Sequence, residues 1–103
     1  MDEQKQYKIE VQPAALSDID NIVDYLNTLS ARTAKKHLDE LEGGINSLRT
    51  FPLRCPPAKI EKYAKLGYHY LVIKYYLAFF TVEGVTVKIQ RIFDGRSNYT
   101  AHI

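Results

Sequence analysis

The chain has 103 residues, of which 46% are hydrophobic and 25% are charged. These proportions are ordinary for a folded soluble protein, and the length suits a single domain over residues 1–103 with one hydrophobic core. No apolar run approaches the roughly 18 residues of a membrane span, and the polar start MDEQKQ lacks the pattern of a signal peptide. The single cysteine, Cys55, cannot form an internal disulfide, so we expect an incidental thiol in a protein of the reducing cytoplasm.

Charge is divided unevenly along the chain. Residues 1–50 hold six Lys or Arg and nine Asp or Glu, a balance of −3, whereas residues 51–103 hold eight and three, a balance of +5. Six of the eight tyrosines also fall in the basic half. Basic and aromatic residues together are typical of surfaces that contact single-stranded RNA, but a tyrosine-rich sheet with solvated lysines accounts for the same composition. Either way, the basic half predicts an acidic or polyanionic partner.

The chain begins with a predicted strand and a predicted helix. Residues 7–11 (YKIEV) alternate between apolar and charged, as in a strand with one buried face. Pro13 suits the first turn of a helix, where its missing N–H has no cost. Apolar residues then recur at helical spacing through residues 16–26, which leaves three aspartates on the solvent side: Asp18, Asp20 and Asp24.

A second helix is predicted after a short break. Ser30 is a suitable N-cap, and apolar residues form one stripe through residues 34–48. The pair Gly43-Gly44 within this stripe indicates either a close approach to another element or a kink. His37 lies among charged residues, so we expect it to be exposed and structural. The helix should end at Phe51-Pro52, because the residue before a proline avoids the α region.

The segment 52–66 is irregular and basic. Three lysines spaced three residues apart would lie on one side of a short helical turn: Lys59, Lys62 and Lys65. They extend the basic side of the strands that follow, and we take them as candidate contacts to a nucleic acid or another target.

The stretch from Tyr68 to Tyr99 predicts three antiparallel strands. Residues 68–82 are apolar or aromatic except at three positions, which is too long for one strand of about 3–10 residues. Turns at Lys74-Tyr75 and Glu83-Gly84 divide the stretch into strands over about 68–73, 76–82 and 85–93. The resulting β-α-α-β-β-β order predicts an α+β fold, in which two antiparallel helices cover one face of a small, mainly antiparallel, twisted sheet. The uncovered face is then the expected place for function.

Three segments resemble toxins of the RelE/ParE superfamily, the toxic half of bacterial type II toxin–antitoxin pairs. INSLRTFPLR is similar to the end of the family's second helix, GYHYLVIKYYLAFFTVEG to its hairpin, and VTVKIQRIFDGRSNY to its last strand and tail. Together with the element order, these matches cover most of the chain. The resemblance implies one of two activities: RelE-like members cut messenger RNA in the ribosome without a metal, and ParE-like members poison DNA gyrase.

The RelE-like activity requires a base, an acid and cations around the scissile phosphate. The candidate catalytic residues are Arg96, Tyr99 and Lys74, and further candidate contacts are His69, Arg91 and His102. Structural roles are also open: Lys74 as a turn residue, Arg91 as an ion-pair partner of Glu10 or an aspartate, and Tyr99 as an anchor of the tail.

Two positions depart from the RelE-like pattern. The arginine that grips the scissile phosphate in RelE-like enzymes is replaced by Tyr76, and Asp94 stands where many members carry histidine or tyrosine. Losing that arginine removes a charge-assisted contact. The resemblance therefore implies a ParE-like toxin first and a RelE-like ribonuclease second, with a non-toxic RNA- or protein-binding module as a further alternative. It also implies a cognate antitoxin as partner, gyrase or ribosome-bound mRNA as target, and neither metal nor organic cofactor.

Overall fold

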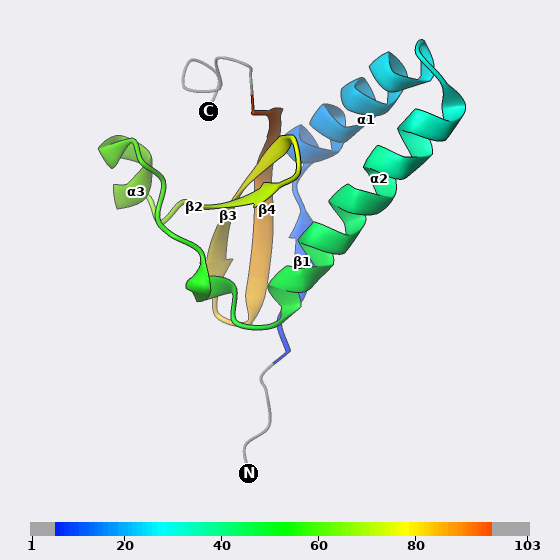
Figure 1. Ribbon diagram of the computed structural model, residues 1–103. Helices are drawn as coiled ribbons and strands as arrows, with labels where there is room; N and C mark the ends of the chain where they lie inside the picture. Colours follow the sequence, from blue (N-terminus) through cyan, green and yellow to red (C-terminus); the bar gives the residue numbers. More distant parts are fainter. Residues whose placement is uncertain (1–5, 96–103) are drawn as a thin grey trace.

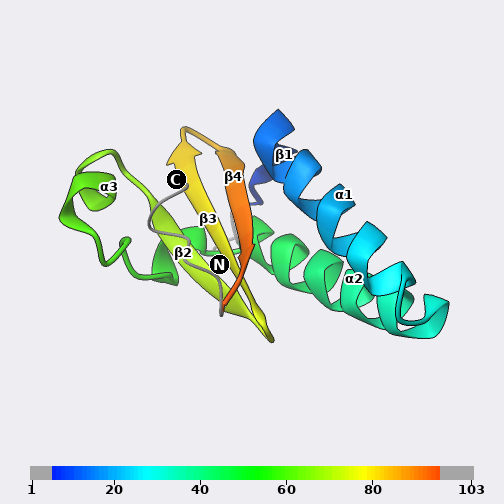
Figure 2. The same cartoon turned by 90° about the horizontal axis from the view of Figure 1, so that it is seen from above.

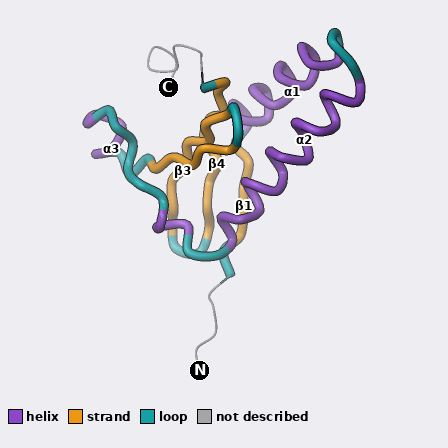
Figure 3. Tube along the Cα trace, in the orientation of Figure 1, coloured by secondary structure: helices purple, strands orange, loops and turns teal. Residues whose placement is uncertain are grey.

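The computed structural model describes residues 6–95 and contains the predicted β-α-α-β-β-β order, with one additional short helix (Figure 1; Figure 3). The helices and strands are, in chain order, β1 (Lys8–Val11), α1 (Pro13–Asn27), α2 (Ala31–Asn46), α3 (Glu61–Lys65), β2 (His69–Ile73), β3 (Tyr76–Glu83) and β4 (Thr86–Asp94). Two 3-10 turns, Ser47–Arg49 and Pro52–Arg54, connect α2 with the α3 segment. None of the helices within residues 6–95 is long and apolar enough to cross a membrane.

The four strands form one sheet in the order β1-β4-β3-β2. β2, β3 and β4 are the predicted antiparallel meander, and β1 pairs with β4 in parallel, with Lys8 opposite Thr86 and Val11 opposite Ile89. The first and last strands are therefore neighbours in space. Because β1 stops at Val11, the last part of β4 continues past the end of its neighbour.

Helices α1 and α2 lie side by side on the same face of the sheet, α1 against β4 and α2 against β2 (Figure 2). Between them and the sheet is the main core, built from α2 residues such as Leu41 and Ile45 and from inward-facing strand residues such as Phe80, Val87 and Ile89. All of these side chains are buried. The predicted fold, two helices on one face of a mainly antiparallel sheet, is confirmed.

Both helices begin where the sequence predicts, but α2 ends earlier than predicted. Pro13 occupies the first turn of α1, and the hydroxyl of Ser30 accepts a hydrogen bond of 2.9 Å from the amide of Thr33. The predicted helix end at Phe51 is wrong, because α2 stops at Asn46 and the chain tightens into a 3-10 turn. The Ser47 hydroxyl donates to the Gly44 carbonyl at 2.6 Å, and such side-chain bonds compete with the helical pattern.

The two glycines of α2 have different surroundings. A Cβ on Gly44 would lie 2.6 Å from the Ile73 side chain in β2, whereas a Cβ on Gly43 would meet nothing within 4 Å. Of the two glycines, only Gly44 lies where α2 approaches the sheet closely. Of the two explanations that the sequence leaves open for this pair, close packing applies.

The hairpin turns lie close to their predicted positions. Lys74 begins the β2–β3 turn with a positive φ of 56°, and Gly84 does the same in the β3–β4 turn with a φ of 63°. The second turn is Gly84-Val85, one residue later than predicted. A β-bulge between Phe79 and Phe80 shifts the register, so that Phe79 is opposite Arg91 and Phe80 is opposite Ile89.

The sequence predicted that the second face of the sheet would be uncovered, but part of this face is covered. The segment 56–68, including α3, runs along the β2 side of this face, and Pro57 forms an isolated bridge with His69 (Figure 1). A second buried cluster forms there from Ala58, Phe79 and Phe93. The irregular segment packs on the sheet because it carries its own apolar residues between its lysines.

Candidate functional site

A cluster of aromatic side chains lies on the second face of the sheet. Its buried cluster is flanked by half-buried side chains of the α3 segment and of strands β2 and β3: Tyr63, Tyr68, Tyr70 and Leu77. The rings of Tyr70 and Phe79 are 6.2 Å apart, and those of Phe79 and Phe93 are 6.1 Å apart in an edge-to-face arrangement. These spacings are typical of aromatic pairs that stabilise a packed layer. Much of the tyrosine content of the basic half therefore packs this face.

A small pocket opens between this aromatic layer and the α3 segment. Its volume is about 170 Å³, and it is lined by Ala58, Lys59, Ile60, Tyr63, Tyr70, Val72, Leu77 and Phe79. Two of the predicted contact lysines stand at its aromatic walls. The Nζ of Lys59 is 6.0 Å from the Tyr70 ring centre, and that of Lys62 is 5.4 Å from the Tyr63 ring centre. The pocket is thus apolar inside and positively charged at the rim.

Lys65, the third lysine of this group, is exposed and forms an ion pair with Glu61 at 3.6 Å. Exposed pairs at this spacing contribute little to stability. Lys62 and Lys65 lie in the short helix α3, whereas Lys59 precedes it, so the single helical turn predicted for all three lysines forms only in part. Their contact with a nucleic acid or another target stays a prediction.

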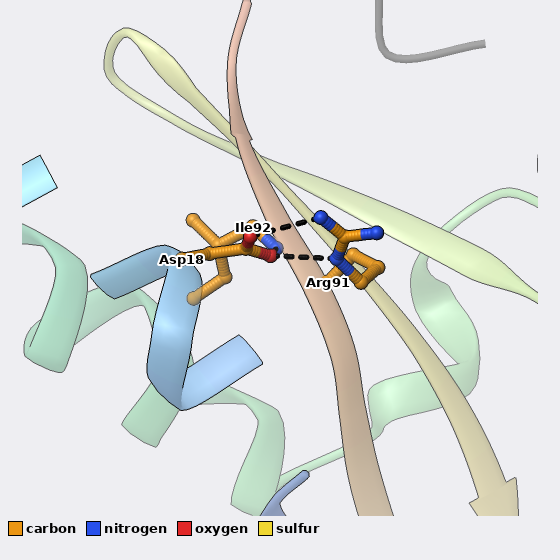
Figure 4. Close-up of polar contacts among 3 residues, drawn as sticks. All are labelled: Asp18, Arg91 and Ile92. Carbon is orange, nitrogen blue, oxygen red and sulfur yellow. Dashed lines mark hydrogen bonds and ion pairs between the residues drawn. The ribbon is translucent and has the colours of Figure 1, made fainter. Parts of the chain in front are cut away.

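Arg91 is held by an aspartate of α1 (Figure 4). Its Nε and Nη2 donate to the two carboxylate oxygens of Asp18 at 2.8 and 2.9 Å, and Asp18 also accepts from the Ile92 amide at 2.8 Å. The hydrogen bond that Arg91 donates to Asp18 holds the pKa of Arg91 above its ordinary value, against the smaller effect of desolvation. The guanidinium lies 4.6 Å from the centre of the Phe93 ring. Arg91 therefore has the structural role that the sequence left open, that of an ion-pair partner, and the partner is Asp18.

The placement of Asp18 on the solvent side was therefore wrong. Its side chain is only 13% exposed, because α1 lies beside the part of β4 that extends past β1. A carboxylate at this position satisfies a strand amide and neutralises a cation at once. The helical pattern of α1 could not reveal a partner 73 residues away.

Lys74 and His69 lie away from the aromatic pocket. Lys74 begins the β2–β3 turn, and its Nζ is 3.9 Å from a carboxylate oxygen of Glu40 in α2. The Nδ1 of His69 is 3.0 Å from the Cys55 carbonyl oxygen, and its ring stacks on Phe80 in the main core. Arg91, Lys74 and His69 thus have three separate sets of neighbours. The remaining candidates, Arg96, Tyr99 and His102, lie outside the described residues.

A larger groove separates the tip of the helix pair from the β2–β3 turn. Its volume is about 610 Å³, and its walls are Asn21, Ile22, Tyr25, Leu26, Leu29, Thr33, His37, Tyr75, Tyr76 and Asp94. Three of its apolar side chains are more than half exposed: Tyr25, Leu29 and Tyr75. Exposed apolar side chains that gather around one groove are typical of a protein-binding site. We call this the helix-tip groove.

Two of its polar residues form a hydrogen-bonded pair. The Nδ1 of His37 is 2.7 Å from the Tyr76 hydroxyl, and the His37 ring stacks on Tyr75. The prediction of an exposed His37 was wrong, because the imidazole packs between α2 and the two tyrosines. Tyr76, which stands at the usual arginine position of RelE-like enzymes, is buried on the helix side. Sequence reasoning missed this groove, and the one available signal was the apolar excess of residues 25–29.

Cys55 lies in the segment between α2 and α3, and its side chain is buried in the main core. Burial raises the pKa of its thiol, and the nearby positive charge of Arg54 only partly offsets that effect. A buried thiol of raised pKa is a poor nucleophile. Within residues 6–95, no group of His, Cys, Asp and Glu is arranged to hold a metal ion.

The architecture matches solved structures of toxin–antitoxin systems. One is the chromosomal ParDE system from P. aeruginosa, with 20% sequence identity, a TM-score of 0.74, and coverage of 87% of this chain and 97% of that chain. Another is the RelBE2 toxin–antitoxin complex from Mycobacterium tuberculosis, with 20% identity, a TM-score of 0.60, and coverage of 91% and 97%. No curated protein matches the sequence. The fold is thus that of RelE/ParE superfamily toxins.

The particular branch follows from a family model. The model of the ParE toxin of type II toxin–antitoxin systems, parDE, matches residues 9–99. The chain therefore belongs to the ParE toxin family, and the expected RelE/ParE resemblance is confirmed.

Proposed function

We propose that this ParE-family toxin arrests growth by acting on DNA gyrase in the cytoplasm and is neutralised by a cognate antitoxin. The observation that carries the proposal is the ParE family match over residues 9–99. The RelE-like ribonuclease is the alternative against which the proposal is tested.

The geometry of the described candidates supports the ParE-like branch. Cleavage of RNA through the 2′-hydroxyl needs a base, an acid and phosphate-binding cations within reach of one point. Arg91 is engaged by Asp18, and His69 is directed toward the Cys55 carbonyl and Phe80. Tyr76 is buried against His37. These side chains do not converge, whereas a gyrase poison requires a binding surface and no reacting groups.

The helix-tip groove is the proposed binding site of the antitoxin. Tyr25, Leu29 and Tyr75 are exposed there and offer apolar contacts. An amphipathic helix can bind such a groove by placing its own apolar side chains against these residues. The relatives of known structure are a ParDE toxin–antitoxin system and a RelBE2 toxin–antitoxin complex, which supports a complex of the same kind here. Acidic residues of the antitoxin would complement the net positive second half of the toxin.

The deciding experiment is tightly controlled induction with two readouts in the same cells. Growth arrest with DNA breaks and intact messenger RNA is expected, together with inhibition of supercoiling by purified gyrase. New RNA 5′ ends that disappear on Arg96→Ala or Tyr99→Phe, without DNA breaks, would establish the ribonuclease instead. Unimpaired growth at high toxin levels would contradict both and favour a non-toxic binding module.

A further inference from the structure

The chain bends sharply after α2, in residues 49–54, which we call the strained turn. At Phe51 the backbone is left-handed, with a φ of 50° and a ψ of 56°. A residue with a Cβ is strained in this conformation, whereas glycine adopts it freely. Within residues 6–95, the one other non-glycine residue with a positive φ is Lys74, which lies in a hairpin turn.

The conformation of the strained turn is fixed from both sides. Leu48 before it and Pro52 within it are fully buried. The residue before a proline avoids the right-handed α region, so Pro52 also limits the alternatives open to Phe51. The Nη1 of Arg54 donates to the carbonyls of Thr50 and Phe51 at 2.8 and 3.1 Å. The turn is therefore a built part of the surface.

The strained turn directs two apolar side chains into solvent. Phe51 and Leu53, on either side of the buried Pro52, are each 60% exposed. Glycine at position 51 would remove the strain, and the exposed part of the phenyl ring does not contribute to the core. Backbone strain persists mainly at functional positions. The combination of strain and exposure therefore indicates that the ring has a role outside the fold.

The surroundings of the two apolar side chains are basic. No Asp or Glu occurs in residues 43–60, whereas Arg49, Arg54 and Lys59 do. Both arginines are exposed, and the oxygens to which they donate, such as the Asn46 side chain and the Thr50 carbonyl, are neutral. Cations whose charge is not balanced by carboxylates, beside apolar side chains, complement an acidic protein surface that has an apolar recess.

The strained turn and the helix-tip groove lie at opposite ends of α2 (Figure 1). His37 of α2 lines the groove, and the helix ends at Asn46 before the strained turn. With a rise of 1.5 Å per residue, the helix covers about 14 Å between these two residues. The two surfaces can therefore be assigned to different partners.

We propose that the strained turn is the surface by which the toxin binds its protein target, with the Phe51 ring in an apolar recess bordered by carboxylates. This inference rests on the proposed function, in which the target is DNA gyrase. Phe51 is the anchor, Leu53 is a second apolar contact, and Arg49 and Arg54 supply the charge. Because the turn is held in place before binding, little conformational entropy is lost when the ring enters the recess.

Two substitutions at Phe51 separate the ring from the backbone strain. Phe51→Gly removes both, and Phe51→Ala removes the ring but keeps a Cβ in the left-handed conformation. Both should weaken binding of the full chain to purified gyrase holoenzyme by at least about 30-fold, as expected of a central aromatic anchor. The Tm of Phe51→Gly should be about 4–8 °C above that of Phe51→Ala. If Phe51 had only a structural role, binding by the folded variants would be unchanged.

A pair of leucines supplies a matched control. Leu53→Ser should weaken gyrase binding about tenfold, whereas Leu66→Ser changes a leucine that is 65% exposed outside the strained turn and should leave binding unchanged. The charge is tested by salt. Binding should weaken about tenfold between 50 and 300 mM salt, and Arg49→Gln should reduce this dependence. Biolayer interferometry measures the affinities, and circular dichroism establishes that each variant is folded.

Three results would overturn the inference. Equal gyrase binding by the unmodified toxin, Phe51→Ala and Leu53→Ser would overturn it and leave the proposed function intact. If the variants lost affinity for a DNA duplex alone and kept their affinity for the gyrase protein, the turn would contact nucleic acid instead. If the unmodified toxin did not bind gyrase with or without DNA, the proposed function would fail together with this inference.

Discussion

The carboxylate of Asp18 takes the place of a neighbouring strand at the end of β4. β1 pairs with β4 only as far as Ile89, and further along β4 the Ile92 amide donates to Asp18 instead. The same carboxylate binds both Nε and Nη2 of Arg91. One side chain thus joins α1 to β4 and satisfies a cation and a backbone amide together.

Asp18→Ala should therefore be costly. We expect a loss of about 2–4 kcal/mol in the free energy of unfolding, because Arg91 and the Ile92 amide would both lose their partner in a largely buried place. Urea unfolding measures the loss. Asp20→Ala on the exposed side of the same helix is the matched control and should change stability by no more than about 0.5 kcal/mol. Equal effects of the two substitutions would contradict the described pair.

Cys55 should be slow to react in the folded protein. Burial raises the pKa of its thiol above the ordinary value of 9.0, so at pH 8 a smaller share is thiolate than in the unfolded chain. We expect modification by a disulfide reagent at pH 8 to be at least about tenfold slower without denaturant than in concentrated urea. Stability should also fall as the pH rises above 9, since the unfolded chain then loses the thiol proton more readily. Similar modification rates in both conditions would show that the segment carrying Cys55 leaves the core freely.

At the scale of the elements, helix α2 combines a helix-weakening sequence with tight packing. Gly43 and Gly44 both lower the intrinsic stability of the helix. Only Gly44 lies against another element, where Ile73 of β2 fills the space of the missing side chain. A side chain at Gly44 would therefore force α2 and β2 apart, whereas one at Gly43 would not.

The two glycines provide a matched pair of substitutions. Gly44→Ala should destabilise the protein by about 1–3 kcal/mol, because the added methyl group overlaps the buried Ile73 side chain. Gly43→Ala should instead stabilise it by about 0.5–1 kcal/mol through helix propensity alone. Thermal or urea unfolding of both variants measures the difference. Stabilisation by both substitutions would mean that β2 moves away from α2 easily.

At the scale of the whole molecule, the two sides of the sheet have different surfaces. The helix side ends in the apolar helix-tip groove, and the opposite side presents an aromatic pocket rimmed by lysines. The two surfaces could serve two different binding partners. Of these, we propose that the antitoxin occupies the helix-tip groove.

Leu29→Asp tests that division. A charge in the apolar wall of the groove should weaken binding of the cognate antitoxin about 100-fold, because an unpaired carboxylate would be desolvated there. Leu16→Asp changes another leucine that is more than half exposed but does not line the groove, and it should leave the affinity within a few-fold. Calorimetry with the purified antitoxin measures both. Equal losses from the two substitutions would place the antitoxin elsewhere.

Much of the fold could be predicted from local patterns. The alternation in residues 7–11 and 85–93, the proline at the start of α1 and the cap at Ser30 each act over a few residues, and each places its element correctly. The packing of the α3 segment on the second face was not predictable, because irregular segments carry no periodic signal.

The candidate site was less predictable for the same reason. Partners such as Asp18 and Arg91, or His37 and Tyr76, are far apart in the chain, and their pairing depends on how the elements pack. The sequence identified Arg91 as an ion-pair candidate, but it could not select Asp18 over Glu10. It also could not tell which side of the sheet His69 faces.

The parallel pairing of β1 with β4 has a consequence for synthesis on the ribosome. Val11 cannot pair with Ile89 until nearly all of the described chain has been translated. The hairpins of β2, β3 and β4, in contrast, form between segments that are close in sequence. The amino-terminal strand of a nascent chain therefore waits unpaired while the rest is made. The sheet is therefore completed only near the end of synthesis, when β1 joins β4.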